Sequence, residues 1–123
     1  MAKQASGRVY NGLAEFVGHI EQEGGYFNIY RGWTEFVGRV EQEGDYYAVY
    51  RAGTESVGRV KLEGETYKVY RNWTRFVGLL RREGRQYKVY QAGTEAIGWV
   101  ELEDTVQVSP LLLSGGAALL LLL

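Results

Sequence analysis

Apolar and polar residues alternate along most of this chain, as the segments 35–42 and 46–51 illustrate. Alternation with a period of two, combined with β-branched and aromatic residue types, is typical of β-strands. The intervening Glu43-Gly44-Asp45 and the following Ala52-Gly53 carry the small or conformationally permissive residues that tight turns require. The pattern therefore predicts short strands joined by tight turns, with no helix before residue 110.

The strand pattern returns every twenty residues. Three columns define the period: Gly18, Gly38, Gly58, Gly78 and Gly98; Gly24, Gly44, Gly64 and Gly84; and Tyr10, Tyr30, Tyr50, Tyr70 and Tyr90. A fixed period of this length is the signature of repeat architectures, in which each unit buries its apolar surface against its neighbours. Two strands per unit give about ten strands.

These features predict an all-β fold of five twenty-residue β-hairpin repeats. Residues 1–9 form a lead-in, residues 10–109 the five-repeat domain and residues 110–123 an apolar tail. An antiparallel meander, a solenoid-like stack and a closed barrel all fit the pattern, and the barrel has no free edge strands. The last unit departs from the others, with Asp104 in a glycine column and Val106-Gln107-Val108 in place of the tyrosine strand. It is either a cap or a strand reserved for a partner.

The glycine in the middle of each predicted strand is unusual. Strict alternation places Phe36, Gly38 and Val40 on one face of the strand, and Val37 and Arg39 on the other. Glycine weakens a strand because it costs conformational entropy and has no side chain to pack. Its return in every unit predicts either a close approach of another backbone segment or a tyrosine ring lying over it.

The repeat resembles the cell-wall-binding, or choline-binding, repeats of bacterial surface proteins. The resemblance rests on the spacing from Gly38-Arg39-Val40 through Gly44-Asp45-Tyr46-Tyr47 to Gly53-Thr54, and it covers residues 10 to about 104. It implies hairpins stacked into a solenoid that attaches to a surface polymer. The family places a tryptophan just after the first glycine, where only Trp99 matches, and another two positions after the second. That second place holds Tyr26, Tyr46, Thr66 and Gln86.

Charge and residue composition exclude several chemistries. The formal net charge is −1 with acids and bases mixed throughout, so no basic stripe predicts a nucleic-acid partner. The chain has no cysteine, which excludes disulfides and thiolate chemistry. The recurring glutamates are interpreted as solvated strand and turn residues, and the single histidine, His19, as an exposed strand residue. We therefore expect no enzyme activity, no metal and no cofactor.

Aromatic and arginine residues form the candidate interaction stripe. Its members are Trp33, Trp73, Tyr46, Tyr47, Tyr50, Arg31, Arg51 and Arg71. Amphipathic aromatic residues flanked by arginine are enriched at contact surfaces. The stripe therefore either stacks on sugars or docks a protein, or else its members only pack across strands and stabilise the sheet.

The tail has no charged residue after Pro110. Its candidate contact residues are Leu111, Leu112, Leu113, Leu119, Leu120 and Leu121. A helix over residues 111–123 spans only about 20 Å, short of the roughly 30 Å of a bilayer core, and Gly115-Gly116 weakens it. An apolar segment of this kind has to be covered, by the end of its own repeat stack, by a neighbouring subunit or by shallow contact with a membrane.

Taken together, the pattern favours a non-enzymatic structural protein that self-assembles into a filament, sheath or other homo-oligomer through its apolar faces and tail. One alternative is a module that binds a surface polymer or carbohydrate through the aromatic and arginine columns. Another is an accessory subunit of a membrane complex, held by the tail. A cell-surface or extracellular location is the weakly favoured one.

Overall fold

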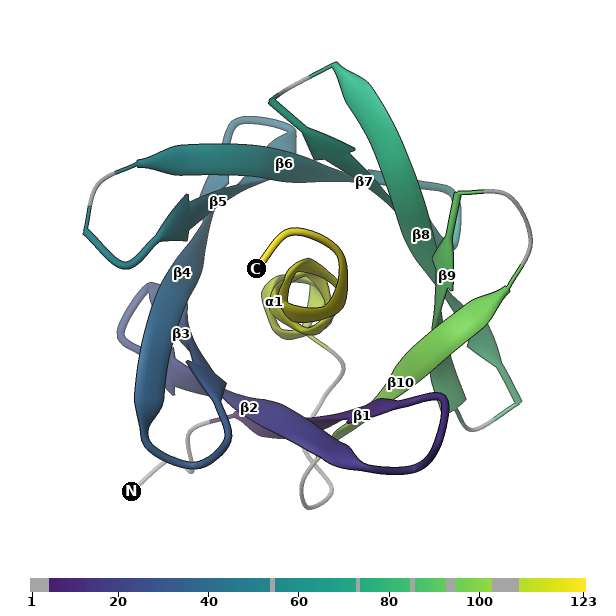
Figure 1. Ribbon diagram of the computed structural model, residues 1–123. Coiled ribbons are helices and arrows are strands. Elements are labelled where there is room, and N and C mark those ends of the chain that lie inside the picture. Colours follow the sequence, from purple (N-terminus) through teal and green to yellow (C-terminus); the bar gives the residue numbers. More distant parts are fainter. Residues whose placement is uncertain (1–4, 54, 73, 85, 93–94, 103–108) are drawn as a thin grey trace.

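The computed structural model describes residues 5–53, 55–72, 74–84, 86–92, 95–102 and 109–123. In these residues ten antiparallel strands close into a barrel around one helix (Figure 1). The elements are β1 (Ser6–Asn11), β2 (Phe16–Glu23), β3 (Tyr26–Arg31), β4 (Glu35–Glu43), β5 (Tyr46–Arg51), β6 (Ser56–Glu63), β7 (Thr66–Arg71), β8 (Arg75–Glu83), β9 (Gln86–Gln91), β10 (Ala96–Leu102) and α1 (Pro110–Leu121). The all-β prediction is confirmed, and the closed barrel is the arrangement observed among the three that the sequence left open.

The barrel closes by pairing its first strand with its last. β1 lies between β2 and β10, with a register that runs from Gly7 opposite Leu102 to Asn11 opposite Gly98. β1 begins at Ser6, inside the segment that the sequence pattern assigned to a lead-in. It supplies the second strand of the fifth hairpin, so the fifth repeat is divided between the two ends of the β domain. Asp104 and residues 106–108, the proposed cap, lie outside the described residues.

A β-bulge interrupts every repeat immediately before the glycine column. Between β3 and β4, Ile29 faces Gly38 but the next residue, Tyr30, faces Phe36, so Val37 has no partner of its own. The same shift recurs in the other repeats. A bulge bends its strand and increases the local twist, which helps ten strands to close. It also turns Phe36 onto the outer face, where it is 41% exposed, so the face predicted for Phe36 was wrong.

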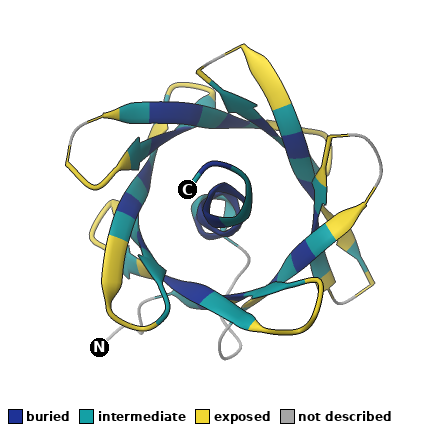
Figure 2. Cartoon of the chain, viewed as in Figure 1, coloured by how far each residue is buried: buried dark blue, intermediate teal, exposed yellow. Residues whose placement is uncertain are grey.

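The tail lies inside the barrel as helix α1, along the barrel axis (Figures 1 and 2). Ser109 caps the helix, its Oγ accepting from the Leu112 N–H at 3.4 Å, and Pro110 occupies the first turn. Residues 112–119 are buried against the inward-facing side chains of the sheet. The tail is covered by its own chain, as one of the three expectations had it, but inside the barrel and not at the end of a repeat stack.

Two glycines allow the helix to fit in the lumen. A Cβ on Gly115 would lie 3.2 Å from side-chain atoms of Ile20 and Val40, and one on Gly116 would lie 2.4 Å from the Val100 side chain. The expectation that these glycines weaken the helix considered only helix propensity. Inside the barrel, the absence of a side chain permits the close packing that stabilises the helix.

The last five leucines each contact one glycine of the mid-strand column. A Cβ on Gly18, Gly98, Gly78, Gly58 or Gly38 would meet a δ-methyl of Leu119, Leu120, Leu121, Leu122 or Leu123 respectively, at 2.8–3.2 Å. At Gly18 the same Cβ would also lie 2.0 Å from the Tyr30 carbonyl oxygen. The column therefore marks a close approach of backbone and helix, which is one of the two causes predicted for it.

The described residues include no helix with the length and apolar character that crossing a bilayer requires.

Candidate functional site

Five tyrosines form a belt around the outer face of the barrel. Each lies directly across from the residue that follows the glycine column on a neighbouring strand. We define the tyrosine belt as the pairs Tyr10–Trp99, Tyr30–His19, Tyr50–Arg39, Tyr70–Arg59 and Tyr90–Leu79. In four of the pairs a planar group lies against the tyrosine ring, at 5.3, 4.7, 4.6 and 5.7 Å between the group and the ring centroid.

The first repeat adds further rings to the belt. Trp33, in the turn between β3 and β4, stacks on Phe16 with centroids 4.3 Å apart and lies 5.2 Å from the His19 ring. His19 in turn stacks on Tyr30 with the two planes 7° apart. We call these four residues, Phe16, His19, Tyr30 and Trp33, the aromatic platform. Trp33 remains 57% exposed although it is held by two neighbouring rings.

His19 occupies the centre of the platform. Its Nε2 lies 2.9 Å from Glu21 Oε2, and its Nδ1 lies 3.1 Å from the Gly32 carbonyl oxygen. Both partners are acceptors, so the imidazolium form donates to both and a neutral ring donates to one. The residue is only 6% exposed. The interpretation of His19 as an exposed strand residue was therefore wrong, because the sequence did not reveal that the turn after β3 brings Trp33 and Gly32 over it.

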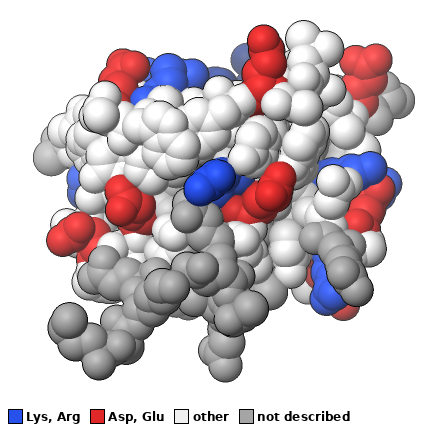
Figure 3. Space-filling view, turned by 90° about the horizontal axis from the view of Figure 1, so that it is seen from below, with Lys and Arg blue, Asp and Glu red and all other residues white. Residues whose placement is uncertain are grey.

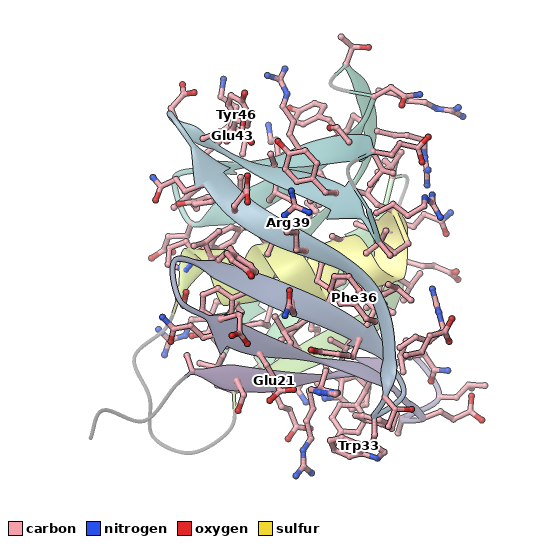
Figure 4. The ribbon with its side chains drawn as sticks, turned by 90° about the vertical axis from the view of Figure 1, so that its left-hand side faces the viewer. Glu21, Trp33, Phe36, Arg39, Glu43 and Tyr46 are labelled. Atoms are coloured by element: carbon pink, nitrogen blue, oxygen red, sulfur yellow. The ribbon has the colours of Figure 1, made fainter. Side chains whose placement is uncertain are left out.

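Charged side chains and the aromatic rings share the outer face. Figure 3 shows acidic and basic side chains interspersed over one face of the barrel, and Arg8 lies 5.4 Å from the centroid of the Trp33 ring. In Figure 4, Trp33 and Phe36 lie toward one end of the barrel, whereas Glu43 and Tyr46 lie toward the other. The aromatic platform is therefore placed at one rim and is bordered by charges of both signs.

Carboxylates fix two tyrosines of the belt. The Tyr50 hydroxyl donates to Glu43, and this hydrogen bond, with burial and the Glu43 and Glu41 charges, raises the pKa of Tyr50 to about 12. The Tyr90 hydroxyl donates to Glu83 in the same way. That hydrogen bond and one from Arg81 lower the pKa of the Glu83 carboxyl. The hydroxyls of both tyrosines are therefore used within the chain, and these hydrogen bonds hold the two rings in place.

The structure divides the predicted aromatic stripe between two faces. Trp33 and Tyr46 belong to the outer face (Figure 4), where Arg59 lies 5.7 Å from the Tyr46 ring centroid. Tyr50 belongs to the same face, because Arg39 lies over its ring. Tyr47 faces inward, opposite Gln42 and Val60, and packs against the core. Trp73 lies outside the described residues. A stripe drawn from sequence spacing alone therefore combines residues that do not share a surface.

Two of the three predicted arginines bind the C-terminal end of the tail inside the barrel. Arg31 donates to the Leu123 carbonyl oxygen at 2.6 Å, and Arg71 donates to the Leu121 carbonyl oxygen at 2.9 Å. Basic groups stabilise the carbonyl end of a helix because its last carbonyls lack partners and carry partial negative charge. Arg51 is different, since it forms a half-exposed ion pair with Glu55 at 3.5 Å.

The predicted tail contacts are part of the barrel core. Leu112, Leu113 and Leu119 are buried, and Leu111, Leu120 and Leu121 pack against the same cluster. These leucines are covered by the strands of their own chain. Leu112, Leu113 and Leu119 therefore offer almost no surface to a neighbouring subunit or a membrane, and Leu111, Leu120 and Leu121 offer only part of theirs.

Among the described residues, no group of three or more histidine, aspartate or glutamate side chains could hold a metal ion. Four hollows on the described part of the barrel are small, at about 250–310 Å³, and two of them also border the tail, at Leu113 and at Leu123. The arrangement thus offers ring faces, guanidinium groups and carboxylates on a rigid outer wall, which is suited to binding by surface contact.

The fold and this outer face define a closed antiparallel barrel of hairpin repeats with an internal helix and an aromatic rim. Comparison with protein-family models, curated proteins and solved structures finds no match to the chain.

Proposed function

We propose that the protein is a non-enzymatic binding module whose aromatic platform holds sugar rings of a neutral polysaccharide. The observation that carries the proposal is the state of Trp33. Its ring is 57% exposed, yet it stacks on Phe16 and borders His19. A ring held in place before binding loses little conformational entropy when a ligand covers it, so more of the contact energy contributes to affinity.

The chemistry around Trp33 matches a sugar ring. A pyranose presents a flat face of C–H groups and a rim of hydroxyls, so it requires an apolar aromatic face bordered by polar groups. The aromatic platform supplies the ring faces. The Glu21 carboxylate, with a side chain 54% exposed, lies at its border as a hydroxyl acceptor, and Arg8 lies on the Trp33 side.

The charge distribution favours a neutral polymer. A strongly anionic polysaccharide is best matched by a surface of one sign, which raises the local concentration of the ligand. The formal net charge of this chain is −1, and the face in Figure 3 carries side chains of both signs. Neutral glucans, mannans and chitin-like polymers therefore fit better than acidic ones.

A second candidate function uses the same rim for assembly. Leu13 is 81% exposed and Phe36 is 41% exposed, and together with Trp33 they form an apolar part of the surface. Exposed apolar side chains of this size favour association between copies. With the tail leucines inside the barrel, this rim is one route for the self-assembly expected from the sequence.

Affinity electrophoresis on gels that contain a soluble glucan, mannan or glycol chitin tests the binding proposal. We expect retardation of the wild-type protein by at least one of these polymers, and a roughly tenfold or greater loss of affinity in Trp33→Ala, since aromatic anchors dominate binding energies. Tyr26→Ala is the matched control, because Tyr26 is an exposed ring on β3 at the opposite end of the strand. Equal mobility of wild type and Trp33→Ala on all the polymers would contradict the proposal.

Light scattering on the same preparations separates the two candidates. If binding is the function, we expect a monomer in the absence of polymer. A large particle that dissociates in Leu13→Ala and Trp33→Ala, with no polymer retardation, would establish assembly as the function of this rim.

A further inference from the structure

The inner wall of the barrel ends in a ring of cross-strand pairs at the mouth formed by the hairpin turns. In these pairs Gln22 lies opposite Phe27, Gln42 opposite Tyr47, Leu62 opposite Tyr67 and Arg82 opposite Tyr87. Between the third and fourth hairpins this mouth holds a hollow of about 250 Å³, whose lining includes Leu62, Glu65, Tyr67, Arg82, Tyr87 and, from helix α1, Leu113. We call it the Tyr67 hollow.

One side of the Tyr67 hollow is apolar. The third hairpin has Leu62 where the first two hairpins have glutamine, and this leucine is 38% exposed. The rings of Tyr67 and Tyr87 pack into the core cluster beside Leu113. This side therefore suits a short aliphatic chain, which gains from leaving water.

Arg82 supplies a guanidinium group that the turn uses only in part. In the first two hairpins the side-chain amides of Gln22 and Gln42 donate to carbonyls of their own turns, each at 3.4 Å. Arg82 makes the same contact with its Nε, at 3.0 Å from the Gly84 carbonyl oxygen. It forms no ion pair with another described residue. Its two Nη groups are therefore donors that can bind a carboxylate.

The tyrosines and Glu65 complete the polar lining. Neither the Tyr67 nor the Tyr87 hydroxyl has a hydrogen-bond partner in the described part of the chain. Burial, together with the nearby Tyr47 and Tyr87 phenols, raises the pKa of Tyr67 to about 12, so its hydroxyl is a neutral donor at physiological pH. Glu65, in the turn between β6 and β7, adds an exposed carboxylate on the other side.

We propose that the Tyr67 hollow binds a free α-amino acid with a short unbranched apolar side chain. The ligand carboxylate accepts from Arg82 and the tyrosine hydroxyls, the ammonium group faces Glu65, and the side chain lies against Leu62. The lining contains one cation and one anion, which matches a zwitterion. A ligand with only a carboxylate would bring it toward Glu65, and a ligand with only an ammonium group would bring it toward Arg82, which is unfavourable in both cases.

Titration of the ¹⁵N-labelled full chain with norleucine, followed by amide chemical shifts, tests the proposal. At about pH 6.5 norleucine is a zwitterion, and low ionic strength limits the screening of exposed charges. We expect millimolar binding, as is usual for so small a ligand, with shifts of amides near Leu62, Tyr67 and Arg82. Hexanoate, which lacks the ammonium group, and pentylamine, which lacks the carboxylate, should both bind more weakly than norleucine.

Two variants separate the two charges. Arg82→Gln restores the residue of the first two hairpins, so it should fold normally and weaken the binding of norleucine and hexanoate about fivefold or more, without weakening that of pentylamine. Glu65→Gln should weaken the binding of norleucine and pentylamine without weakening that of hexanoate. Arg75→Gln is the matched control, because Arg75 is an exposed arginine at the other end of β8 and should leave all three unchanged.

Three outcomes would overturn the proposal. One is the absence of local shifts with norleucine. The second is binding of hexanoate or pentylamine as tight as that of norleucine, and the third is norleucine binding that persists unchanged in Arg82→Gln. Trp33 lies at the opposite rim from the hairpin turn marked by Glu43 and Tyr46 in Figure 4. Trp33→Ala should therefore leave norleucine binding unchanged, so the result is independent of the polysaccharide proposal.

Discussion

The mid-strand glycines are the most stringent test of how the barrel and its internal helix fit together. In Gly58→Ala the new Cβ would lie 2.2 Å from the Tyr70 carbonyl oxygen and 3.1 Å from a δ-methyl of Leu122. Side-chain carbons essentially never approach an atom within 3.0 Å, so strand or carbonyl has to move by about 0.8 Å. Overpacking of a dense interior costs about 1–3 kcal/mol. We expect a cost near the upper end of this range here, because a backbone carbonyl cannot rotate away as a side chain can.

Urea unfolding followed by circular dichroism measures this cost. We expect Gly58→Ala to lower the free energy of unfolding by about 3 kcal/mol. Gly25→Ala is the control, since nothing lies within 4 Å of a Cβ there, and its stability should change by less than about 0.5 kcal/mol. Adding Leu122→Ala to Gly58→Ala should recover little, because the carbonyl is the closer obstacle. A Gly58→Ala protein as stable as the wild type would refute the close-packing explanation of the glycine column.

Two further predictions concern buried polar groups. Ser114 Oγ is buried in helix α1 and has no hydrogen-bond partner among the described residues, so Ser114→Ala should raise the free energy of unfolding by about 1 kcal/mol. Ser109→Ala removes the helix cap and should lower the free energy of unfolding by a similar amount. A loss of stability in Ser114→Ala would contradict this reasoning. Burial, reinforced by the Tyr47 and Tyr87 phenols, raises the pKa of Tyr67 to about 12. The folded state thus favours the neutral phenol, and its contribution to stability is present below about pH 10 and lost as the pH rises toward 12. Spectrophotometric titration at 295 nm should show one fewer late-titrating tyrosine in Tyr67→Phe than in the wild type, with Tyr50 titrating late in both proteins.

The sequence predicted the strands well because their signal is local. Alternation and turn residues placed one hairpin at residues 35–42 and 46–51, and β4 and β5 occupy Glu35–Glu43 and Tyr46–Arg51. Closure was left open because it depends on a pairing between the two ends of the β domain. Val9 and Tyr10 repeat the Ile29 and Tyr30 positions, but a pattern counted from Tyr10 starts too late to include the strand that they form.

The candidate site was harder to predict because it depends on register. A bulge of one residue at Val37 moves Phe36 to the other face of the sheet, and the alternation of apolar and polar residues does not reveal this bulge. The burial of His19 requires knowing that Tyr30 lies opposite and that the following turn places Trp33 beside it. The position of the tail could be predicted neither from its helix propensity nor from the length of the apolar segment. Gly115 and Gly116 favour the helix only inside a lumen lined by Ile20, Val40 and Val100.

The five leucines at the end of the chain explain why function is expected on the outer face. Residues 119–123 contact the five glycines in the order of the repeats around the barrel, one residue for each repeat. One turn of an α-helix has 3.6 residues, so five consecutive residues extend beyond a single turn around the barrel axis. The helix widens at its end, where the Leu122 and Leu123 N–H groups both donate to the Ala118 carbonyl.

At this position every repeat keeps a glycine, because a Cβ would collide with the carbonyl oxygen of a neighbouring tyrosine and would also press on a leucine of the tail. The outward face has no such restriction, and it is where the repeats differ. His19 distinguishes the first repeat, and Leu79 distinguishes the fourth. In a barrel whose interior is filled by its own helix, these outward departures from the repeat are the positions at which a ligand can be recognised without loss of the core.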